Sequence, residues 1–176
     1  MTASGAGESV HASAVKVGDQ AVLIRGPSGA GKSRLAFELI LAGRSGQLPS
    51  SVLVGDDRVH LDTRGGEVWV RPVQQLAGLI EIRGLGIRGC DFVAEARVGF
   101  IVDLMAEDAE RLPPPASCHA TIHGIDIPRI AVGPSYTPFL LVAAAFTTTE
   151  TSCSSNLSAN CVKGIGNHIT SSIASE

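Results

Sequence analysis

A short apolar run, a glycine-rich octapeptide and an amphipathic segment follow one another near the start of the chain. Residues 20–25 (QAVLIR) are nearly all apolar and predict a short buried strand. The octapeptide GPSGAGKS (26–33) follows directly, and apolar residues then recur at helical spacing, which predicts a helix over residues 33–42. Gly43 is the expected C-terminal cap, because glycine readily adopts the left-handed conformation that ends many helices.

Most of the remaining apolar segments predict strands. Residues 10–17 are extended and lead through a Gly18-Asp19 turn into the strand at 20–25, as in a hairpin. Further strands are predicted at 51–55, 58–61, 67–71, 97–103, 119–123 and 125–132. One strand–loop–helix unit followed by a mostly β continuation indicates an α/β fold, a P-loop-containing nucleotide-binding core with a mixed β-sheet.

The chain divides into three stretches. Its 176 residues allow one domain of ordinary size. Residues 1–8 are small and polar and predict a flexible N-terminus, and residues 9–146 carry all the predicted elements. Residues 147–176 are rich in Ser and Thr without hydrophobic periodicity, which predicts a weakly ordered tail.

Charge and composition exclude several classes of function. A net charge of −3 argues against a general nucleic-acid-binding protein. The longest apolar run, residues 139–146, is far shorter than the ~20 residues of a membrane-spanning helix. The N-terminus lacks the basic and apolar regions of a signal peptide, and the four cysteines form no C-x-x-C pair. We therefore expect a cytoplasmic protein with reduced thiols.

The octapeptide carries the strongest chemical signal. It fits the pattern G-x-x-x-x-G-K-[ST] at every position: Gly26, Pro27, Ser28, Gly29, Ala30, Gly31, Lys32 and Ser33. In such a loop the backbone N–H groups surround phosphate oxygens, and the positive end of the following helix dipole adds to the attraction. The lysine reaches the β- and γ-phosphates, and the serine hydroxyl ligates Mg²⁺. An apolar strand before the loop and a helix after it make a coincidental glycine-rich turn improbable.

Two acidic segments are further candidates. Asp56 and Asp57 follow the strand at 51–55, where P-loop enzymes place a metal-binding carboxylate, so that one could serve the metal and the other accept a proton. The alternative is a polar turn in which Asp57 pairs with Arg58 on the surface. The segment EIRGLGI (81–87) combines a carboxylate, a guanidinium and two glycines, and by itself it fits a phosphate and metal site or a turn with a surface ion pair.

Five other side chains carry weaker signals. A lone His11 between apolar residues is more often structural than catalytic. Cys118, His119 and His123 have no fourth ligand at suitable spacing, and their segment is not helical, which disfavours a metal site. Arg111, on a proline-rich loop, is either a phosphate-reaching arginine or a solvated charge.

These segments together resemble the catalytic domain of bacterial HPr kinase/phosphorylase. The matching pieces are Ser9-Val10-His11, GPSGAGKS, GDDRV (55–59) and EIRGLGI, of which the last is the most diagnostic. The resemblance covers residues 9–146. The chain is similar to the short form of the family, which consists of the C-terminal catalytic domain alone. It implies the HPr kinase/PEP carboxykinase-like fold.

The resemblance also implies a role for individual residues. Residues 26–33 would bind ATP, Lys32 would also be catalytic, and Ser33 and Glu81 would ligate Mg²⁺. Asp56, the first of the pair, would be the proton acceptor during phosphorylation and the proton donor in the reverse reaction. His11 and Arg111 would be active-site residues near the transferred phosphoryl group.

The implied activity is ATP-dependent phosphorylation of a serine on the phosphocarrier protein HPr, with phosphorolysis of phosphoseryl-HPr as a second activity. The implied assembly is a homo-oligomer, a hexamer by family resemblance, with neither nucleic acid nor membrane as a partner. Two alternatives stay open from the residues: a P-loop kinase of a small molecule, and a non-catalytic ATP-binding sensor. An intact set of Lys32, Ser33, Asp56 and Glu81 favours catalysis over sensing.

Overall fold

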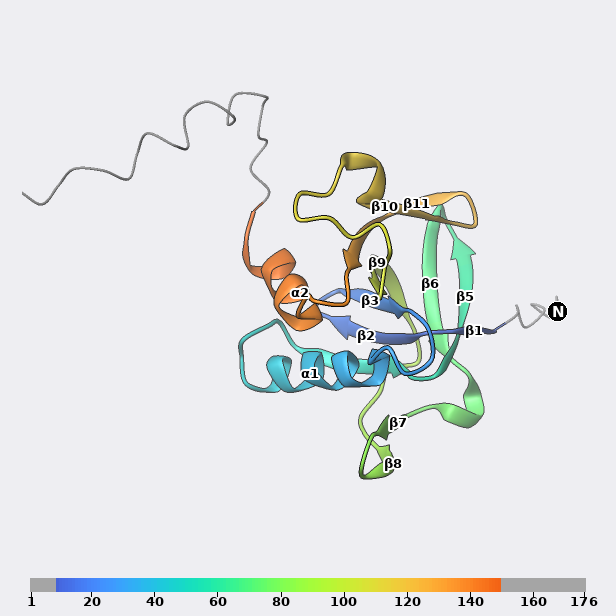
Figure 1. The fold of residues 1–176 in the computed structure, drawn as a ribbon. Helices are drawn as coiled ribbons and strands as arrows, with labels where there is room; N and C mark the ends of the chain where they lie inside the picture. The colour runs from blue at the N-terminus through green and yellow to red at the C-terminus, as the bar shows by residue number, and fades with distance from the viewer. Residues whose placement is uncertain (1–8, 150–176) are drawn as a thin grey trace, which may run out of the picture.

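The computed structural model describes residues 9–149, which form a mixed β-sheet with helices packed against one face (Figure 1). The helices are α1 (Lys32–Arg44) and α2 (Pro138–Thr147), with short 3₁₀ turns η1 (Gln74–Leu76) and η2 (Pro115–Ser117). The strands are β1 (Ser9–His11), β2 (Ser13–Val17), β3 (Gln20–Arg25), β4 (Ser51–Gly55), β5 (Arg58–Arg64), β6 (Glu67–Pro72), β7 (Leu79–Ile82), β8 (Gly86–Gly89), β9 (Ala96–Leu104), β10 (His119–Ile122) and β11 (Ile125–Val132).

Nine of these strands form the main sheet, in the order β1-β5-β6-β9-β3-β2-β4, with β11 also paired to β9 and β10 to β11. β9 runs parallel to both β3 and β11, and the other pairs are antiparallel. The prediction of a mixed sheet is therefore confirmed. β7 and β8 form a separate antiparallel hairpin, which projects at the bottom of Figure 1.

β3 is buried on both faces, which explains why its sequence is continuously apolar rather than alternating. Val22 and Ile24 belong to the cluster beneath the helices, together with Leu35 and Leu39 of α1. Ala21 and Leu23 point to the opposite face, into a second cluster formed largely by the other strands. The strand that leads into the glycine-rich loop is thus fixed from both sides.

Most predicted elements are confirmed, with small shifts at their ends. The Gly18-Asp19 turn joins β2 to β3, where Val17 pairs with Gln20. Residues 10–17 are not one strand, however, because the chain breaks at Ala12: β1 pairs with β5, and β2 pairs with β3 and β4. The hairpins β5–β6 and β10–β11 are confirmed.

The prediction that Gly43 caps α1 is wrong. The helix continues through Arg44, and the N–H of the capping residue, Ser45, donates to the Leu41 carbonyl at 2.9 Å. Gly43 lies where the helix passes closest to β4: a Cβ at this position would lie 2.5 Å from the backbone nitrogen of Ser51. Close packing, rather than a left-handed conformation, explains this glycine.

Gly43→Ala is therefore expected to destabilise the protein by about 1–3 kcal/mol, the usual effect of overfilling a packed site. Helix propensity alone would favour alanine by about 1 kcal/mol, so the packing and the propensity arguments predict opposite changes in the free energy of unfolding. Urea unfolding followed by circular dichroism shows whether Gly43→Ala lowers or raises that free energy. A raised unfolding midpoint would show that α1 has room to move away from β4.

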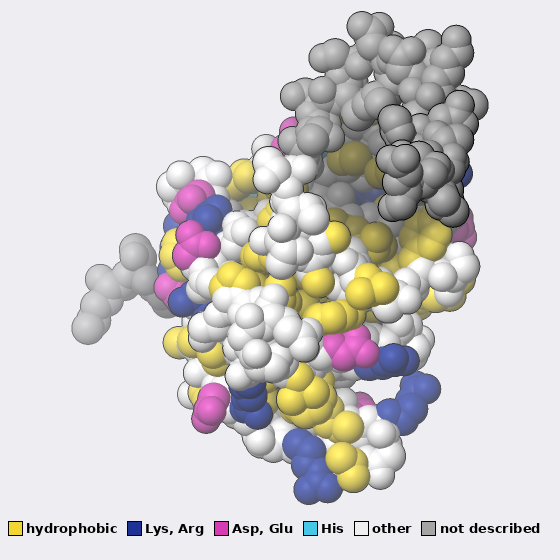
Figure 2. All heavy atoms as spheres, turned by 90° about the vertical axis from the view of Figure 1, so that its left-hand side faces the viewer, with side chains coloured by type: hydrophobic (Ala, Val, Ile, Leu, Met, Phe, Trp, Pro, Cys, Tyr) yellow, Lys and Arg dark blue, Asp and Glu magenta, His cyan; other side chains and the backbone are white. Residues whose placement is uncertain are grey.

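The sequence did not predict the β7–β8 hairpin or α2. The β7–β8 hairpin contains the EIRGLGI segment, and α2 contains the apolar run at 139–146. Figure 2 shows hydrophobic side chains gathered on the face that carries α1 and α2, and Leu41 and Leu140 are among the exposed ones. Neither helix among residues 9–149 is long and apolar enough to cross a membrane.

Some sequence predictions fall outside the described residues. These are the flexible start at 1–8, the tail beyond residue 149, and the thiol state of Cys153 and Cys161. Cys90 and Cys118 are free thiols. The domain boundary at 146 stays a prediction, with α2 ending one residue later.

Candidate active site

The glycine-rich octapeptide connects β3 to α1 as a compact loop. Gly26, Gly29 and Gly31 have φ angles of 146°, 80° and 96°, a region that residues with side chains rarely adopt. Gly26 is also held close to β9, because a Cβ there would lie 2.9 Å from the Leu104 carbonyl oxygen. The glycines thus permit a loop whose backbone closes at the N-terminus of α1, where a phosphate group is favoured.

Lys32 begins α1 and turns back over the loop. Its side chain is buried, and its Nζ donates to the carbonyl oxygens of Gly26 and Pro27 at 3.0 and 3.1 Å. Burial lowers the pKa of the Lys32 ammonium from its ordinary value of 10.5, while the nearby Asp56 and Asp57 carboxylates act in the opposite direction. The lysine side chain is therefore already held against the backbone of the loop.

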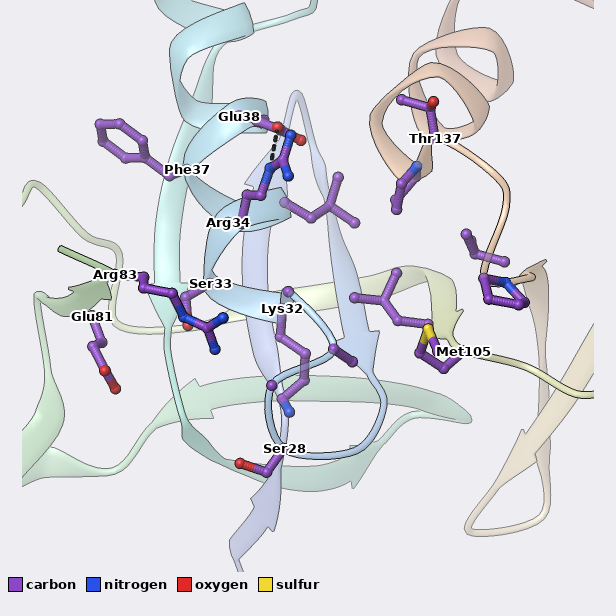
Figure 3. A pocket seen from close by; sticks show the side chains of 18 of the residues that line it. Ser28, Lys32, Ser33, Arg34, Phe37, Glu38, Glu81, Arg83, Met105 and Thr137 are labelled. Atoms are coloured by element: carbon purple, nitrogen blue, oxygen red, sulfur yellow. Dashed lines mark hydrogen bonds and ion pairs between the residues drawn. The ribbon is translucent and has the colours of Figure 1, made fainter.

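A cavity of about 910 Å³ opens beside this loop, a size typical of small-molecule sites (Figure 3). The first turns of α1 border it, and the β7–β8 hairpin and the segments after β9 and β11 contribute further residues. Its lining includes His11, residues 28–35, Phe37, Glu38, Asp57, residues 81–83, Leu104, Met105, residues 132–134 and residues 136–138. The cavity thus brings together His11, most of the octapeptide and Glu81, which lie far apart in the sequence.

Asp57 points into this cavity and pairs with His11. Its Oδ1 lies 3.3 Å from His11 Nε2, and the Asp57 side chain is 64% exposed. The backbone of Asp57 has a φ of 63°, a conformation that aspartate tolerates better than most residues. Arg58 turns away and donates to Ser9, so the alternative of a surface Asp57–Arg58 pair is wrong.

Asp56 lies beneath the cavity rather than in its lining. It is 3% exposed, and both of its carboxylate oxygens are engaged. Ser13 Oγ of β2 donates to Oδ1 at 2.5 Å, and the backbone N–H of Glu81 donates to Oδ2 at 3.1 Å. The two adjacent aspartates therefore have different environments: Asp56 tethers the β7–β8 hairpin to the main sheet, and Asp57 faces the space where a substrate would lie.

The oxygen atoms available to a cation fit Mg²⁺. Ser33 and Glu81 both line the cavity, one at the start of α1 and the other on β7. No group of three or more His, Cys, Asp and Glu side chains within residues 9–149 is arranged to hold a metal. Mg²⁺ is commonly bound by one or two protein ligands together with substrate phosphates and water, which is what a hydroxyl, a carboxylate and a phosphate loop offer.

Arg111 does not reach the cavity. It lies exposed in the segment between β9 and η2 and is absent from the lining.

The segment that carries Arg111 is anchored by Arg129 of β11. Arg129 donates two hydrogen bonds to Asp108 at 2.7 and 2.9 Å and one to Asp103 of β9 at 2.5 Å. Asp103 also accepts two hydrogen bonds at 2.7 Å from Arg25, the residue before Gly26. A chain of charges thus joins the phosphate loop to the Arg111 segment.

Arg83 lines the cavity, although the family resemblance assigned it no individual role. The sequence placed a guanidinium in the 81–87 segment, but the alternative of a surface ion pair was open. Within residues 9–149 neither Glu81 nor Arg83 forms an ion pair, and both line the cavity. The Arg-Gly sequence in a turn was the signal available for this residue.

Comparisons with known proteins agree with this arrangement. The family model for the HPr Serine kinase C-terminal domain matches residues 4–133. The HPr kinase/phosphorylase of Streptococcus thermophilus is 42% identical over 80 residues, which make up 45% of this chain and 24% of that protein. The enzyme of Streptococcus pyogenes is 40% identical over a stretch of the same length. The match thus spans about a quarter of the length of these curated relatives.

The fold is also similar to a solved structure, the Hpr(Ser) kinase/phosphatase from Coxiella burnetii. The TM-score is 0.63 at 25% sequence identity, and the match covers 78% of this chain and 92% of that one.

Proposed function

Because this chain belongs to the HPr Serine kinase C-terminal domain family, we propose that it transfers the γ-phosphoryl group of ATP to a serine of an HPr-type phosphocarrier protein. The observation that carries this proposal is the convergence of the phosphate loop, the His11–Asp57 pair and Glu81 on one open cavity. Phosphoryl transfer requires mainly positioning and neutralisation of charge, and these residues supply both.

Each residue has a distinct part in the proposed reaction. The N–H groups of the loop and the Lys32 ammonium bind the phosphates of the nucleotide. Ser33 and Glu81 hold Mg²⁺, which neutralises phosphate charge when bound. The serine oxygen of the acceptor forms a bond to the γ-phosphorus as the bond to the β–γ bridging oxygen breaks, and ADP leaves.

Asp57 accepts the serine proton in this scheme. Its carboxylate is exposed to the cavity and oriented by His11, whereas Asp56 is buried with both oxygens engaged. A proton acceptor must come within hydrogen-bond reach of the attacking hydroxyl, and the exposure of Asp57 permits that approach. The geometry therefore favours the second aspartate over the first, to which the family resemblance assigned the role. In reverse, phosphorolysis would return the proton from Asp57 to the serine.

The decisive experiment is the intact mass of HPr after incubation with the protein and Mg-ATP. A gain of one phosphate, absent when the acceptor serine is replaced by alanine, is the expected result. Nucleotide binding without a gain of mass would favour a small-molecule acceptor or a sensor. Native mass spectrometry of the same sample tests the hexamer. Arg111 lies outside the cavity of the single chain, so its role in the active site stays a prediction.

A further inference from the structure

Arg83 extends from the β7–β8 hairpin toward the phosphate loop. Figure 3 shows its side chain directed to the space in front of Lys32 and Ser33. One terminal guanidinium nitrogen lies 3.9 Å from the point that a Cβ on Gly29 would occupy. A glycine at position 29 leaves this gap open, and an oxygen atom of a phosphate on the loop would fall within reach of the guanidinium.

The local sequence fixes this direction. The N–H of Leu85 donates to the Ile82 carbonyl at 2.9 Å, which closes a tight turn with Arg83 and Gly84 at its centre. Gly84 has a φ of 89°, whereas Arg83 has an ordinary negative φ, as in a type II turn. Arginine therefore occupies the turn position that needs no glycine.

The β7–β8 hairpin is also anchored from below. Asp56 accepts the backbone N–H of Glu81, two residues before Arg83, and Asp56 itself is held by Ser13 of the main sheet. The tether thus sets the position of Glu81 and Arg83 together relative to the phosphate loop.

Arg83 has no anionic partner within residues 9–149, and no hydrogen bond of its side chain is formed there. Arg34, also on the cavity, instead pairs with Glu38 at 2.9 Å. A guanidinium binds phosphate through two parallel hydrogen bonds, a geometry that lysine cannot provide. The unpaired charge beside the loop is thus available to an anionic ligand.

We propose that Arg83 contacts the terminal phosphates of the bound nucleotide and stabilises the charge that develops during transfer, which makes it a further catalytic residue. This proposal rests on the proposed function for the transfer step, but its binding step requires only a nucleoside triphosphate.

The test compares Arg83→Gln with Arg88→Gln. Arg88 lies on the other strand of the same hairpin and outside the cavity, so both variants lose one charge from the same element. Calorimetry with Mg-ATP and with AMP measures binding, and HPr phosphorylation measures transfer. Arg83→Gln is expected to weaken ATP binding by about 10- to 100-fold, to leave AMP binding unchanged and to lower kcat by about 10²–10³-fold. Arg88→Gln should match the wild type.

Equal ATP affinity and equal kcat in Arg83→Gln and the wild type would overturn the proposal. The same losses in Arg88→Gln would also overturn it, since they would reflect the charge of the hairpin and not a contact. If the wild type binds ATP but does not phosphorylate HPr, the proposed function fails, and the ratio of ATP to AMP affinity still decides the role of Arg83.

Discussion

Asp57→Asn is expected to lower the rate of HPr phosphorylation by about 10²–10⁴-fold, the usual contribution of a general base. The amide keeps the size of the carboxylate but cannot accept the serine proton. Because Asp57 is exposed and its side chain forms an ion pair only with His11 among residues 9–149, neither folding nor ATP affinity should change by much. Single-turnover phosphorylation, thermal unfolding and calorimetry with Mg-ATP measure the three quantities.

Asp56→Asn is the matched control, one residue earlier in the chain. An amide at this position places an NH₂ group against Ser13 or the Glu81 N–H, where a carboxylate oxygen now accepts. We expect a loss of about 1–3 kcal/mol in the free energy of unfolding, since one buried donor loses its acceptor. A normal rate in Asp57→Asn, with transfer lost in a stably folded Asp56→Asn, would instead return the role of proton acceptor to Asp56.

The aspartate pair shows what the sequence decides and what it leaves open. Two adjacent carboxylates after a strand are enough to predict that one serves the chemistry. Which of them faces the cavity depends on the backbone turn at Asp57, with its φ of 63°, and on the pairing of β1 with β5 that brings His11 nearby. Neither is encoded in the spacing of the motif.

The phosphate loop was predictable because its signal is local. An apolar strand, a fixed octapeptide and a helix are contiguous, and all three appear where the sequence predicts them. Gly43 was misassigned because its cause is not local: the contact with Ser51 arises from the packing of α1 on β4. A glycine near a helix end can be a left-handed cap or a site of close packing. The sequence alone favours the cap, which is the commoner of the two.

The β7–β8 hairpin and α2 were missed for a different reason. All four residues of β8 are exposed, and glycines interrupt the hairpin, so the alternation that marks a half-buried strand is absent. α2 is apolar around its whole circumference and has no helical periodicity, although only Val142 is fully buried. Both elements border the cavity. The sequence therefore predicted the phosphate loop but not the parts of the cavity wall that these two elements form.

Asp103 is the centre of the charge network that joins the phosphate loop to the rest of the sheet, and Asp103→Asn is expected to cost about 3–5 kcal/mol of folding free energy. Its side chain is 16% exposed and accepts hydrogen bonds from Arg25 and Arg129. An amide would leave two guanidinium groups without a full negative charge. Arg129, at 13% exposure, would retain only Asp108 as an anionic partner among the described residues.

The pH dependence identifies this loss as electrostatic. Burial alone would raise the pKa of Asp103, but the hydrogen bonds and charges of Arg25 and Arg129 outweigh it and lower the pKa below the ordinary 3.8. Folding therefore gains from the ionised carboxylate above that ordinary value, and the gain is lost as the pH falls through the lower pKa of the folded state. Urea unfolding at pH 7 and at stepwise lower pH should show wild type and Asp103→Asn converging below about pH 4. A difference that stays constant with pH would mean that packing, and not the ion pairs, holds β3 and the phosphate loop against β9.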